Sequence, residues 1–307
     1  MLAMLAYKRP AWSKTERSFI NRFIRPLGVE EDAFGNLYKR IGTAPVLWSS
    51  HTDTVHNKGG KQLLTFASGI VRAEDVQSNC LGADCTAGVW LMIQMIRAGK
   101  HGLYVFHRAE EIGGRGSEFI ASKTPELLDG IAYAIAFDRK GHSSVITHQA
   151  YGRCCSEAFA ASLGDALGMG HTADSGGTFT DTANYTGLVG ECTNLSVGYM
   201  NEHTKRESLD WDYLDCLRGA LLTLDVDALV SSRAPGEIDA EDFDSRDWGY
   251  SFDDEDQEPM ARGTTLASLV RDHPDAVADW LEEYGITADE IATAIYLRGG
   301  VLRRHRR

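Results

Sequence analysis

Two adjacent glutamates, Glu110 and Glu111, follow an apolar run in the segment RAEEIGGRGS, residues 108–117. Neighbouring side chains on a strand point to opposite faces, and two adjacent like charges repel each other. The pair is accounted for if one carboxylate binds a metal ion while the other transfers a proton. This hypothesis requires further metal ligands elsewhere in the chain.

Further polar residues stand at the ends of other strand-like segments. The segment SSHTDTV places His51 and Asp53 two positions apart directly after an apolar run, so the two residues share a face. Asp53 can therefore accept a hydrogen bond from the His51 ring, or from a group just behind it, and such a carboxylate makes histidine a better ligand. Asp84 stands on a glycine-flanked turn before a helix, and Asp138 and His203 each follow a strand-like run.

These residues form a donor set for zinc. Zinc takes nitrogen or oxygen ligands at about 2.0–2.2 Å, and one carboxylate can bridge two ions roughly 3.5–4 Å apart. Two histidines and three carboxylates, with one carboxylate left over, are what two zinc ions need. The other eight histidines are predicted to be surface or satisfied core residues: His56, His101, His107, His142, His148, His171, His273 and His305.

The elements that must position these residues alternate between helix and strand. Apolar spacing predicts helices over residues 13–28 and 86–100, and short apolar runs predict buried strands at 44–50, 101–106 and 131–137. Such alternation indicates an α/β fold with three layers: a mixed, mostly parallel sheet with helices on both faces. In open sheets of this kind, ligands bind outside the carboxyl ends of the strands, where the polar residues would converge.

The character of the sequence changes after residue 230. Residues 1–230 are predicted to form the catalytic domain, residues 231–259 an acidic linker, and residues 260–307 a small helical appendage. Between residues 237 and 258 there are eleven acidic residues and one base, so this stretch carries −10 of the net charge of −13. Residues 237–307 are a candidate docking segment for a protein partner.

Composition excludes several classes of function. The hydrophobic fraction of 43% is ample for a core, but no apolar run approaches the roughly 18 residues of a membrane helix. No basic stripe is present, so nucleic-acid binding is not expected. The start of the chain lacks the pattern of a secretory signal, and the six cysteines show no regular spacing, so they are predicted to be reduced thiols in a cytoplasmic protein.

Taken in order, the motifs resemble those of a known family. DAFGNLY, APVLWSSHTDTV, GADCTAG, RAEEIGGRGS, AFDRKG, GGTFTDTANY and NLSVGYMNEHTKRESLD are similar to the successive motifs of the co-catalytic di-zinc exopeptidase clan, over roughly residues 10–230. This clan includes aminopeptidases, glutamate carboxypeptidases and N-acyl amino acid deacylases. The resemblance implies two zinc ions as cofactors, with cobalt or manganese as alternatives.

The resemblance also implies a role for each residue. His51, Asp84 and Asp138 would hold one zinc ion. Asp84, Glu111 and His203 would hold the other, with Asp84 as the bridge. Glu110 would be the general base that activates a zinc-bound water, and Asp53 would be the carboxylate behind His51. The peptide bond between Asp84 and Cys85 is expected to be cis.

The sequence departs from the family at three places. Cys85 follows the bridging aspartate where relatives commonly have a second aspartate, which removes an acceptor behind the ligands. The segment between Asp138 and His203 is too short to hold the lid domain of many relatives together with the strands of the catalytic sheet. With the lid absent, its oxyanion-stabilising histidine is absent too, and the sequence names no replacement. The acidic linker and the helical appendage have no counterpart in the family.

The leading prediction is a metal-dependent amide hydrolase, most consistent with an aminopeptidase acting on peptides. In the deacylases and carboxypeptidases of the clan, lid residues usually bind the substrate carboxylate, and the lid is absent here. An N-acyl amino acid deacylase or carboxypeptidase is the alternative, with Arg139 or Arg115 binding that carboxylate. A non-catalytic binding protein on the same fold, with a partner-docking C-terminal tail, is an alternative of another class.

Overall fold

The computed structural model describes residues 1–74, 77–149, 152–237 and the isolated positions 270, 271, 274, 277 and 278. The chain divides into two compact units, Met1–Asp244 and Ser245–Arg307, and every element named below belongs to the first. The predicted acidic linker beyond residue 237 and the predicted helical appendage 260–307 lie outside the described residues, apart from those isolated positions.

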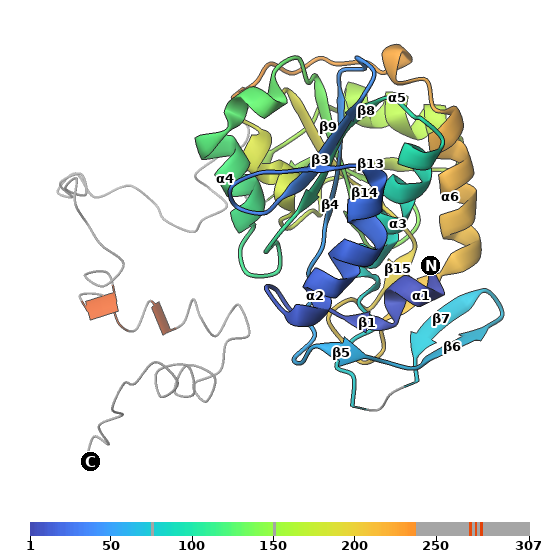
Figure 1. The fold of residues 1–307 in the computed structure, drawn as a ribbon. Helices are drawn as coiled ribbons and strands as arrows, with labels where there is room; N and C mark the ends of the chain where they lie inside the picture. The colour runs from blue at the N-terminus through green and yellow to red at the C-terminus, as the bar shows by residue number, and fades with distance from the viewer. Residues whose placement is uncertain (75–76, 150–151, 238–269, 272–273, 275–276, 279–307) are drawn as a thin grey trace. The chain divides into compact units, whose positions relative to one another are not determined.

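An eight-stranded sheet runs through the centre of this unit (Figure 1). Its strands, in spatial order, are β13 (Thr172–Asp174), β10 (Ser144–Ile146), β14 (Glu191–Ser196), β9 (Tyr133–Arg139), β4 (Val46–His51), β8 (Gly102–His107), β3 (Leu37–Ile41) and β2 (Glu30–Glu31). The middle strands β14, β9, β4 and β8 are parallel, whereas β10 and β3 run antiparallel to their inner neighbours. The predicted mixed, mostly parallel sheet is confirmed, and the carboxyl ends of its middle strands meet at one edge.

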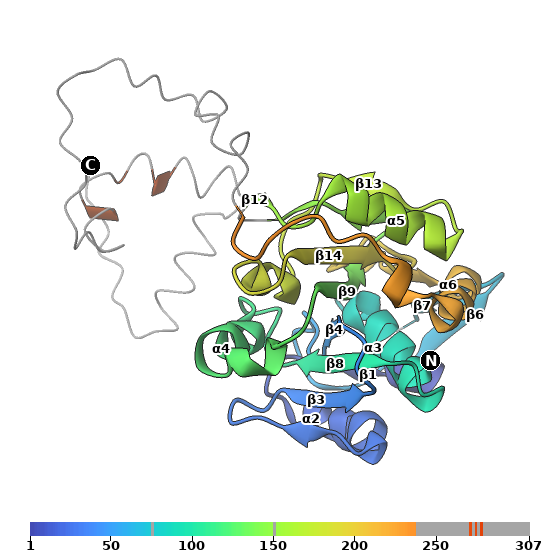
Figure 2. The same ribbon diagram turned by 90° about the horizontal axis from the view of Figure 1, so that it is seen from above.

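Helices cover both faces of the sheet, as predicted (Figure 2). The helices α3 (Ala83–Arg97), α5 (Glu157–Leu167) and α6 (Trp211–Thr223) share one apolar cluster with one face. The helix α4 (Arg115–Lys123) and the 3-10 helix η4 (Asp181–Tyr185) contribute to a second cluster on the other face. Successive strand residues alternate between the two clusters, as the two-residue period of a strand requires.

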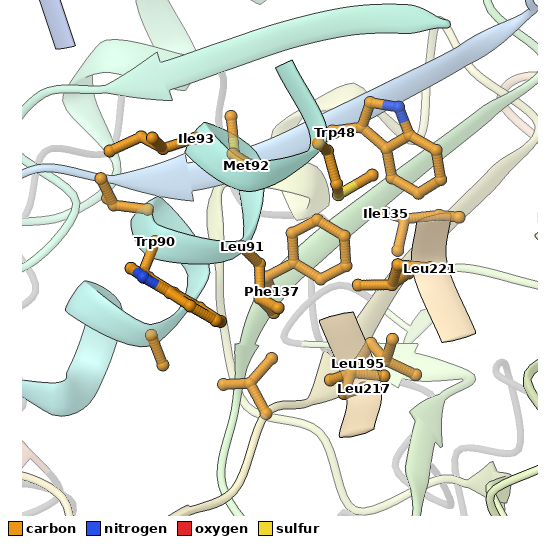
Figure 3. Packing of buried hydrophobic residues seen from close by; sticks show 14 of the residues in the cluster. Trp48, Trp90, Leu91, Met92, Ile93, Ile135, Phe137, Leu195, Leu217 and Leu221 are labelled. Carbon is orange, nitrogen blue, oxygen red and sulfur yellow. The ribbon is translucent and has the colours of Figure 1, made fainter. Parts of the chain in front are cut away.

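The larger cluster joins α3 to the strands that carry the site. On β4, Trp48 packs in this cluster, while its neighbour Leu47 packs in the smaller one. The rings of Trp48 and Phe137 are stacked, with centroids 5.7 Å apart and planes 8° apart (Figure 3). Helix α3 is thereby held against β4 and β9, and this packing fixes the place of its first turn relative to the strand ends.

The helix predicted over residues 13–28 is present but not uniform. Helix α2 (Lys14–Phe19) begins after Ser13, whose hydroxyl accepts a backbone N–H of the first turn. The chain continues as a π-helix, η1 (Ile20–Ile24), and a 3-10 helix, η2 (Arg25–Leu27). It ends at Gly28, whose φ of 70° suits glycine, so the predicted end of this helical segment at residue 28 is confirmed.

Smaller elements complete the unit. The remaining strands and helices are α1 (Leu2–Leu5), β1 (Tyr7–Lys8), β5 (Gly60–Lys61), β6 (Leu64–Ala67), β7 (Ile70–Ala73), η3 (Pro125–Leu128), β11 (His148–Gln149), β12 (Gly152–Arg153), β15 (Tyr199–Met200), β16 (Ser208–Asp210) and η5 (Val226–Ala228). The strands β15, β16, β7 and β6 form a second sheet in that order. In the described part of the chain, no helix has the length and apolar character needed to cross a membrane.

Candidate metal centre

The predicted ligands gather at the carboxyl edge of the parallel strands. His51 is the last residue of β4, Asp138 lies inside β9 one residue before its end, and Glu110 and Glu111 follow β8. The sequence prediction placed His51 and Asp138 directly after their strands. This placement was wrong, because both residues belong to the strands themselves. The strand-like run predicted before His203 is in fact two strands, β14 and β15, and His203 lies on the turn after the second.

Asp84 comes from the start of α3 rather than from the sheet. Asp84 and Cys85 depart from helical geometry, and the peptide bond between them is cis, as the resemblance implied. Four residues further along, Gly88 lets α3 approach β9 closely. A Cβ at Gly88 would stand 2.3 Å from the carbonyl oxygen of Phe137, so no other residue type fits there. The first turn of α3 therefore reaches the end of β9.

Asp84 stands between the two histidines. Its Oδ1 lies 3.0 Å from Nε2 of His51, and its Oδ2 lies 3.1 Å from Nε2 of His203. Asp138 is on the His51 side, with Oδ1 3.2 Å from Nε2 of His51. Glu111 is on the other side, with Oε2 3.2 Å from Nε2 of His203. The five side chains thus form two groups of donors that share one carboxylate.

The cluster lies in a cavity of about 210 Å³ and is largely withdrawn from solvent. The side chains of Asp84, Asp138 and Glu111 are 11%, 6% and 7% exposed, and only His203 is half exposed. Oε1 of Glu111 is buried without a hydrogen-bond partner. A buried carboxylate oxygen left unpaired is costly unless a cation faces it. This orphaned oxygen and the nitrogen and oxygen donor set fit the two zinc ions that the resemblance implies.

The pKa shifts show that the cluster attracts positive charge. Burial, followed by the neighbouring charge of Asp84, raises the pKa of Asp138 to about 7. Burial and the same charge raise the pKa of Glu111. Hydrogen bonds to Asp84 and Glu111 raise the pKa of His203 to about 11. For Asp84 itself, burial would raise the pKa, but hydrogen bonds with both histidines outweigh burial and lower it. Crowded carboxylates that draw protons onto histidines are suited to holding divalent cations.

Glu110 faces the same cavity without joining either donor group. Its Oε2 lies 3.9 Å from Nε2 of His51. Burial raises the pKa of Glu110 well above its ordinary range, and nearby carboxylates add to this shift while His51 opposes it. The two adjacent glutamates therefore face different partners, Glu111 towards His203 and Glu110 towards His51 and the cavity.

Asp53 lies behind His51, but its carboxylate also has another function in the structure. Oδ1 of Asp53 is 3.5 Å from Nδ1 of His51, and that ring nitrogen is closer to the main-chain oxygen of Asp53, at 3.2 Å. The two carboxylate oxygens accept the backbone N–H groups of Glu110 and Glu111, each at 3.2 Å. One side chain thus holds both the histidine and the backbone of the glutamate pair.

The sequence prediction missed three residues that hold the ligands in place. Thr180 donates its hydroxyl to Oδ2 of Asp138 at 2.7 Å, and Asn194 exchanges hydrogen bonds with the Asp138 backbone. Glu207 binds the start of α3, as described below. All three residues lie inside the motifs GGTFTDTANY and NLSVGYMNEHTKRESLD, so their place in these motifs was the available signal.

Three other predictions concern residues around the site. Sγ of Cys85 donates to the carbonyl oxygen of Phe137 at 3.0 Å, so this thiol is hydrogen-bonded to the backbone of β9. None of the six cysteines forms a disulfide. His107 is buried against Asp181 and Tyr185 and is a satisfied core residue, as predicted. The described residues of 139–202 form strands of the central sheet and of two smaller sheets, α5, η4 and short connections, and they include no separate lid domain.

Comparison with solved structures places this fold among known peptidases. The chain is similar to aminopeptidase PepT from Bacillus cereus, with a TM-score of 0.57 and 15% identity over 74% of this chain and 96% of that one. It is similar to a tripeptidase from Staphylococcus aureus, with a TM-score of 0.61 and 14% identity over 74% and 96% of the two chains. It is also similar to the TET1 peptidase of Pyrococcus horikoshii, with a TM-score of 0.51 and 16% identity over 72% and 96%.

This chain shares the fold of these peptidases. By sequence, it matches no protein-family model and no curated protein. At such low identity the likeness extends to the fold, which confirms the predicted fold class, and the activity has to be argued from the side chains of the site.

Proposed function

We propose that the protein is a metal-dependent peptidase that uses two zinc ions, and that it acts as an exopeptidase of the aminopeptidase type. The observation that carries this proposal is the position of Asp84, whose two carboxylate oxygens contact two different histidines. A single metal site does not need a carboxylate shared in this way, whereas two ions in one cavity do.

The five ligands would divide between the two ions. His51, Asp138 and one oxygen of Asp84 would hold the first ion. Glu111, His203 and the other oxygen of Asp84 would hold the second. When bound, the zinc ions polarise the scissile carbonyl and lower the pKa of the attacking water.

The remaining carboxylate, Glu110, is placed to move the proton. It faces the cavity with no hydrogen-bond commitment to a ligand, and Asp53 fixes the backbone on which it stands. Glu110 takes a proton from the attacking water and delivers it to the leaving nitrogen, as a general base followed by a general acid. Burial of the carboxylate limits competing contact with solvent.

The surroundings of the cavity favour an aminopeptidase over a deacylase. A deacylase or carboxypeptidase must bind a substrate carboxylate, and Arg139 is the arginine that lines the cavity. Its Nη2 already donates to the carbonyl oxygen of Gly176 at 2.9 Å and to Oδ2 of Asp174 at 3.3 Å. Arg139 is thus engaged by the end of β13 and the residues that follow it. A free amino group, by contrast, suits a cavity that carries several carboxylates.

The proposal is tested by metal analysis combined with a substrate screen. The purified full chain is expected to hold two zinc ions and to hydrolyse aminoacyl-anilides faster than N-acyl amino acids. A chelator should abolish this hydrolysis, and added zinc should restore it. Faster cleavage of N-acyl amino acids would assign the deacylase activity instead. Two bound ions without hydrolysis of either class would favour a non-catalytic binding protein on the same fold.

A further inference from the structure

Glu207 is a buried carboxylate that no catalytic step uses. Its side chain is 1% exposed, and its two oxygens accept four consecutive backbone N–H groups. Oε2 accepts from Leu81 and Gly82, each at 2.8 Å, and Oε1 accepts from Ala83 at 2.7 Å and Asp84 at 3.1 Å. Leu81 and Gly82 directly precede α3, and Ala83 and Asp84 are its first two residues. The start of this helix has no cap from a neighbouring side chain. Glu207 supplies that cap from a segment 123 to 126 positions further along the chain.

The same residue is tied to the half-exposed histidine of the site. His203 and Glu207 stand four positions apart on the turn between β15 and β16, and the backbone N–H of Glu207 donates to the carbonyl oxygen of Thr204 at 3.0 Å. Asn201 and His203 both have positive φ, 55° and 61°, so the turn is sharply bent. It directs His203 to Oδ2 of Asp84 and directs Glu207 to the backbone beneath the same aspartate.

We infer that Glu207 is a positioning residue for the second metal site, the one formed by Asp84, Glu111 and His203. This inference rests on the proposed function, because it assumes that the cluster binds two ions. Through one carboxylate, Glu207 fixes the segment that carries the bridging ligand relative to the turn that carries the terminal histidine. A ligand pair fixed in this way needs no reordering when the ion binds, and lost support of this kind typically reduces metal affinity 10–100-fold.

The two ions should differ in their dependence on Glu207. The first ion would also be held by His51 and Asp138, which stand on the adjacent strands β4 and β9 and are fixed by the sheet. The second would depend on Glu111, in the loop after β8, and on His203, on the turn. The second ion therefore has less support from the sheet, and the effect of losing Glu207 should concentrate on it.

The chain offers a matched control in Glu191. This carboxylate is also fully buried and also accepts four hydrogen bonds, including one from the backbone of Ser156 at the N-terminus of α5. It stands at the first position of β14, at the amino end of the parallel strands, whereas the site lies at their carboxyl end. Glu191→Gln therefore removes a comparable structural carboxylate without touching the ligands.

The experiment compares zinc affinity among Glu207→Gln, Glu207→Asp, Glu191→Gln and the unchanged full chain. A competing chromophoric chelator gives a dissociation constant for each ion, and the spectrum of the cobalt-loaded protein reports the geometry of each site. In Glu207→Gln the second ion should bind 10–100-fold more weakly, because the amide cannot accept four N–H groups. The affinity for the first ion should change little. Glu207→Asp, which keeps the carboxylate, should recover part of the loss. Glu191→Gln should melt at a lower temperature yet bind both ions as the unchanged chain does.

The outcomes separate this inference from the proposed function. If the unchanged chain binds two ions and Glu207→Gln binds both with the same affinities, the positioning role is wrong and the proposed function stands. Equal weakening of both ions, or an equal loss in Glu191→Gln, would also overturn it, because either result describes a general loss of structure. If the unchanged chain binds fewer than two ions, the di-zinc proposal itself fails.

Discussion

Buried carboxylates occur in two kinds of surroundings in this protein. At the amino end of the sheet, both oxygens of Glu191 accept hydrogen bonds from the backbone and from a serine. On α2, Glu16 accepts from Arg108, from the Thr52 hydroxyl and from a backbone N–H. At the carboxyl edge, in contrast, carboxylates face one another and two histidines, and an oxygen of Glu111 has no partner.

The difference shows how a site can be distinguished from a structural network without a bound ligand. A carboxylate whose oxygens all accept hydrogen bonds is complete and holds chain segments together. A cluster with more buried negative charge than donors is incomplete, and a cation is the chemical group that completes it. The four predictions below test this distinction, from the largest expected effect to the smallest.

The largest effect is expected for the carboxylate that is neither structural nor a ligand. Glu110→Gln should reduce turnover on the order of 10²–10⁴-fold, the usual contribution of general acid–base catalysis, while both ions and the melting temperature stay unchanged. Turnover and zinc content are measured on the same preparation. Glu118→Gln, on the exposed face of α4, is the control and should be fully active. Full activity in Glu110→Gln, or loss of an ion from it, would show that its role has been assigned wrongly.

The second prediction concerns a satisfied carboxylate. Glu16 is fully buried, and its Oε1 lies 2.6 Å from Nε of Arg108, which is 12% exposed. Glu16→Gln leaves the arginine without its counter-ion and should lower the free energy of unfolding by about 3–5 kcal/mol, as breaking a buried pair does. Chemical denaturation measures this loss. Zinc content should remain at two ions. A variant that unfolds normally but loses metal would contradict the distinction between the two kinds of carboxylate.

Sequence reasoning recovered the fold and the strand ends beside which the candidate ligands lie, because both rest on local patterns. The apolar runs that became β4, β8 and β9 end beside His51, Glu110 and Asp138, so the positions of these residues in the sequence already indicated one edge. Their ligand and catalytic roles stay predictions.

The supporting residues could not be derived in the same way, because they depend on contacts between distant segments. Glu207 and the backbone of Leu81 are 126 positions apart in the chain, and no local pattern relates them. The same holds for Thr180, which reaches Asp138 from a segment 42 positions away.

The third prediction tests whether metal completes the site. Five ligands from separate segments converge, so an ion that binds the folded chain alone should stabilise it by about 2.7 kcal/mol at a free concentration of a hundred times its dissociation constant. Removal of metal by a chelator should therefore lower the melting temperature by roughly 5–10 °C for a domain of this size. Differential scanning calorimetry with and without chelator measures the shift. An unchanged melting curve, with loss of zinc verified, would argue against the metal centre.

The smallest effect is the most specific, and it concerns Glu111 in protein from which metal has been removed. Burial and the charge of Asp84 raise the pKa of Glu111, so the ionised carboxylate is less favourable in the folded chain than in the unfolded chain. At pH values above this raised pKa, Glu111→Gln should remove that cost and stabilise the metal-free protein. As the pH falls through the raised pKa towards the ordinary value for glutamate, the cost disappears, so the advantage of the variant should vanish.

Thermal melting of both chains in excess chelator, over a range of pH, measures this difference. The variant should be the more stable chain without metal and the less stable one with zinc, because the amide has lost the charge that holds the ion. Glu191→Gln provides the opposite case: it removes a carboxylate whose hydrogen bonds are complete and should destabilise the chain with or without zinc. A Glu111→Gln variant that behaves like Glu191→Gln would mean that Glu111 is a structural carboxylate. Opposite signs for the two variants would instead identify Glu111 as a residue whose charge is retained for the ion.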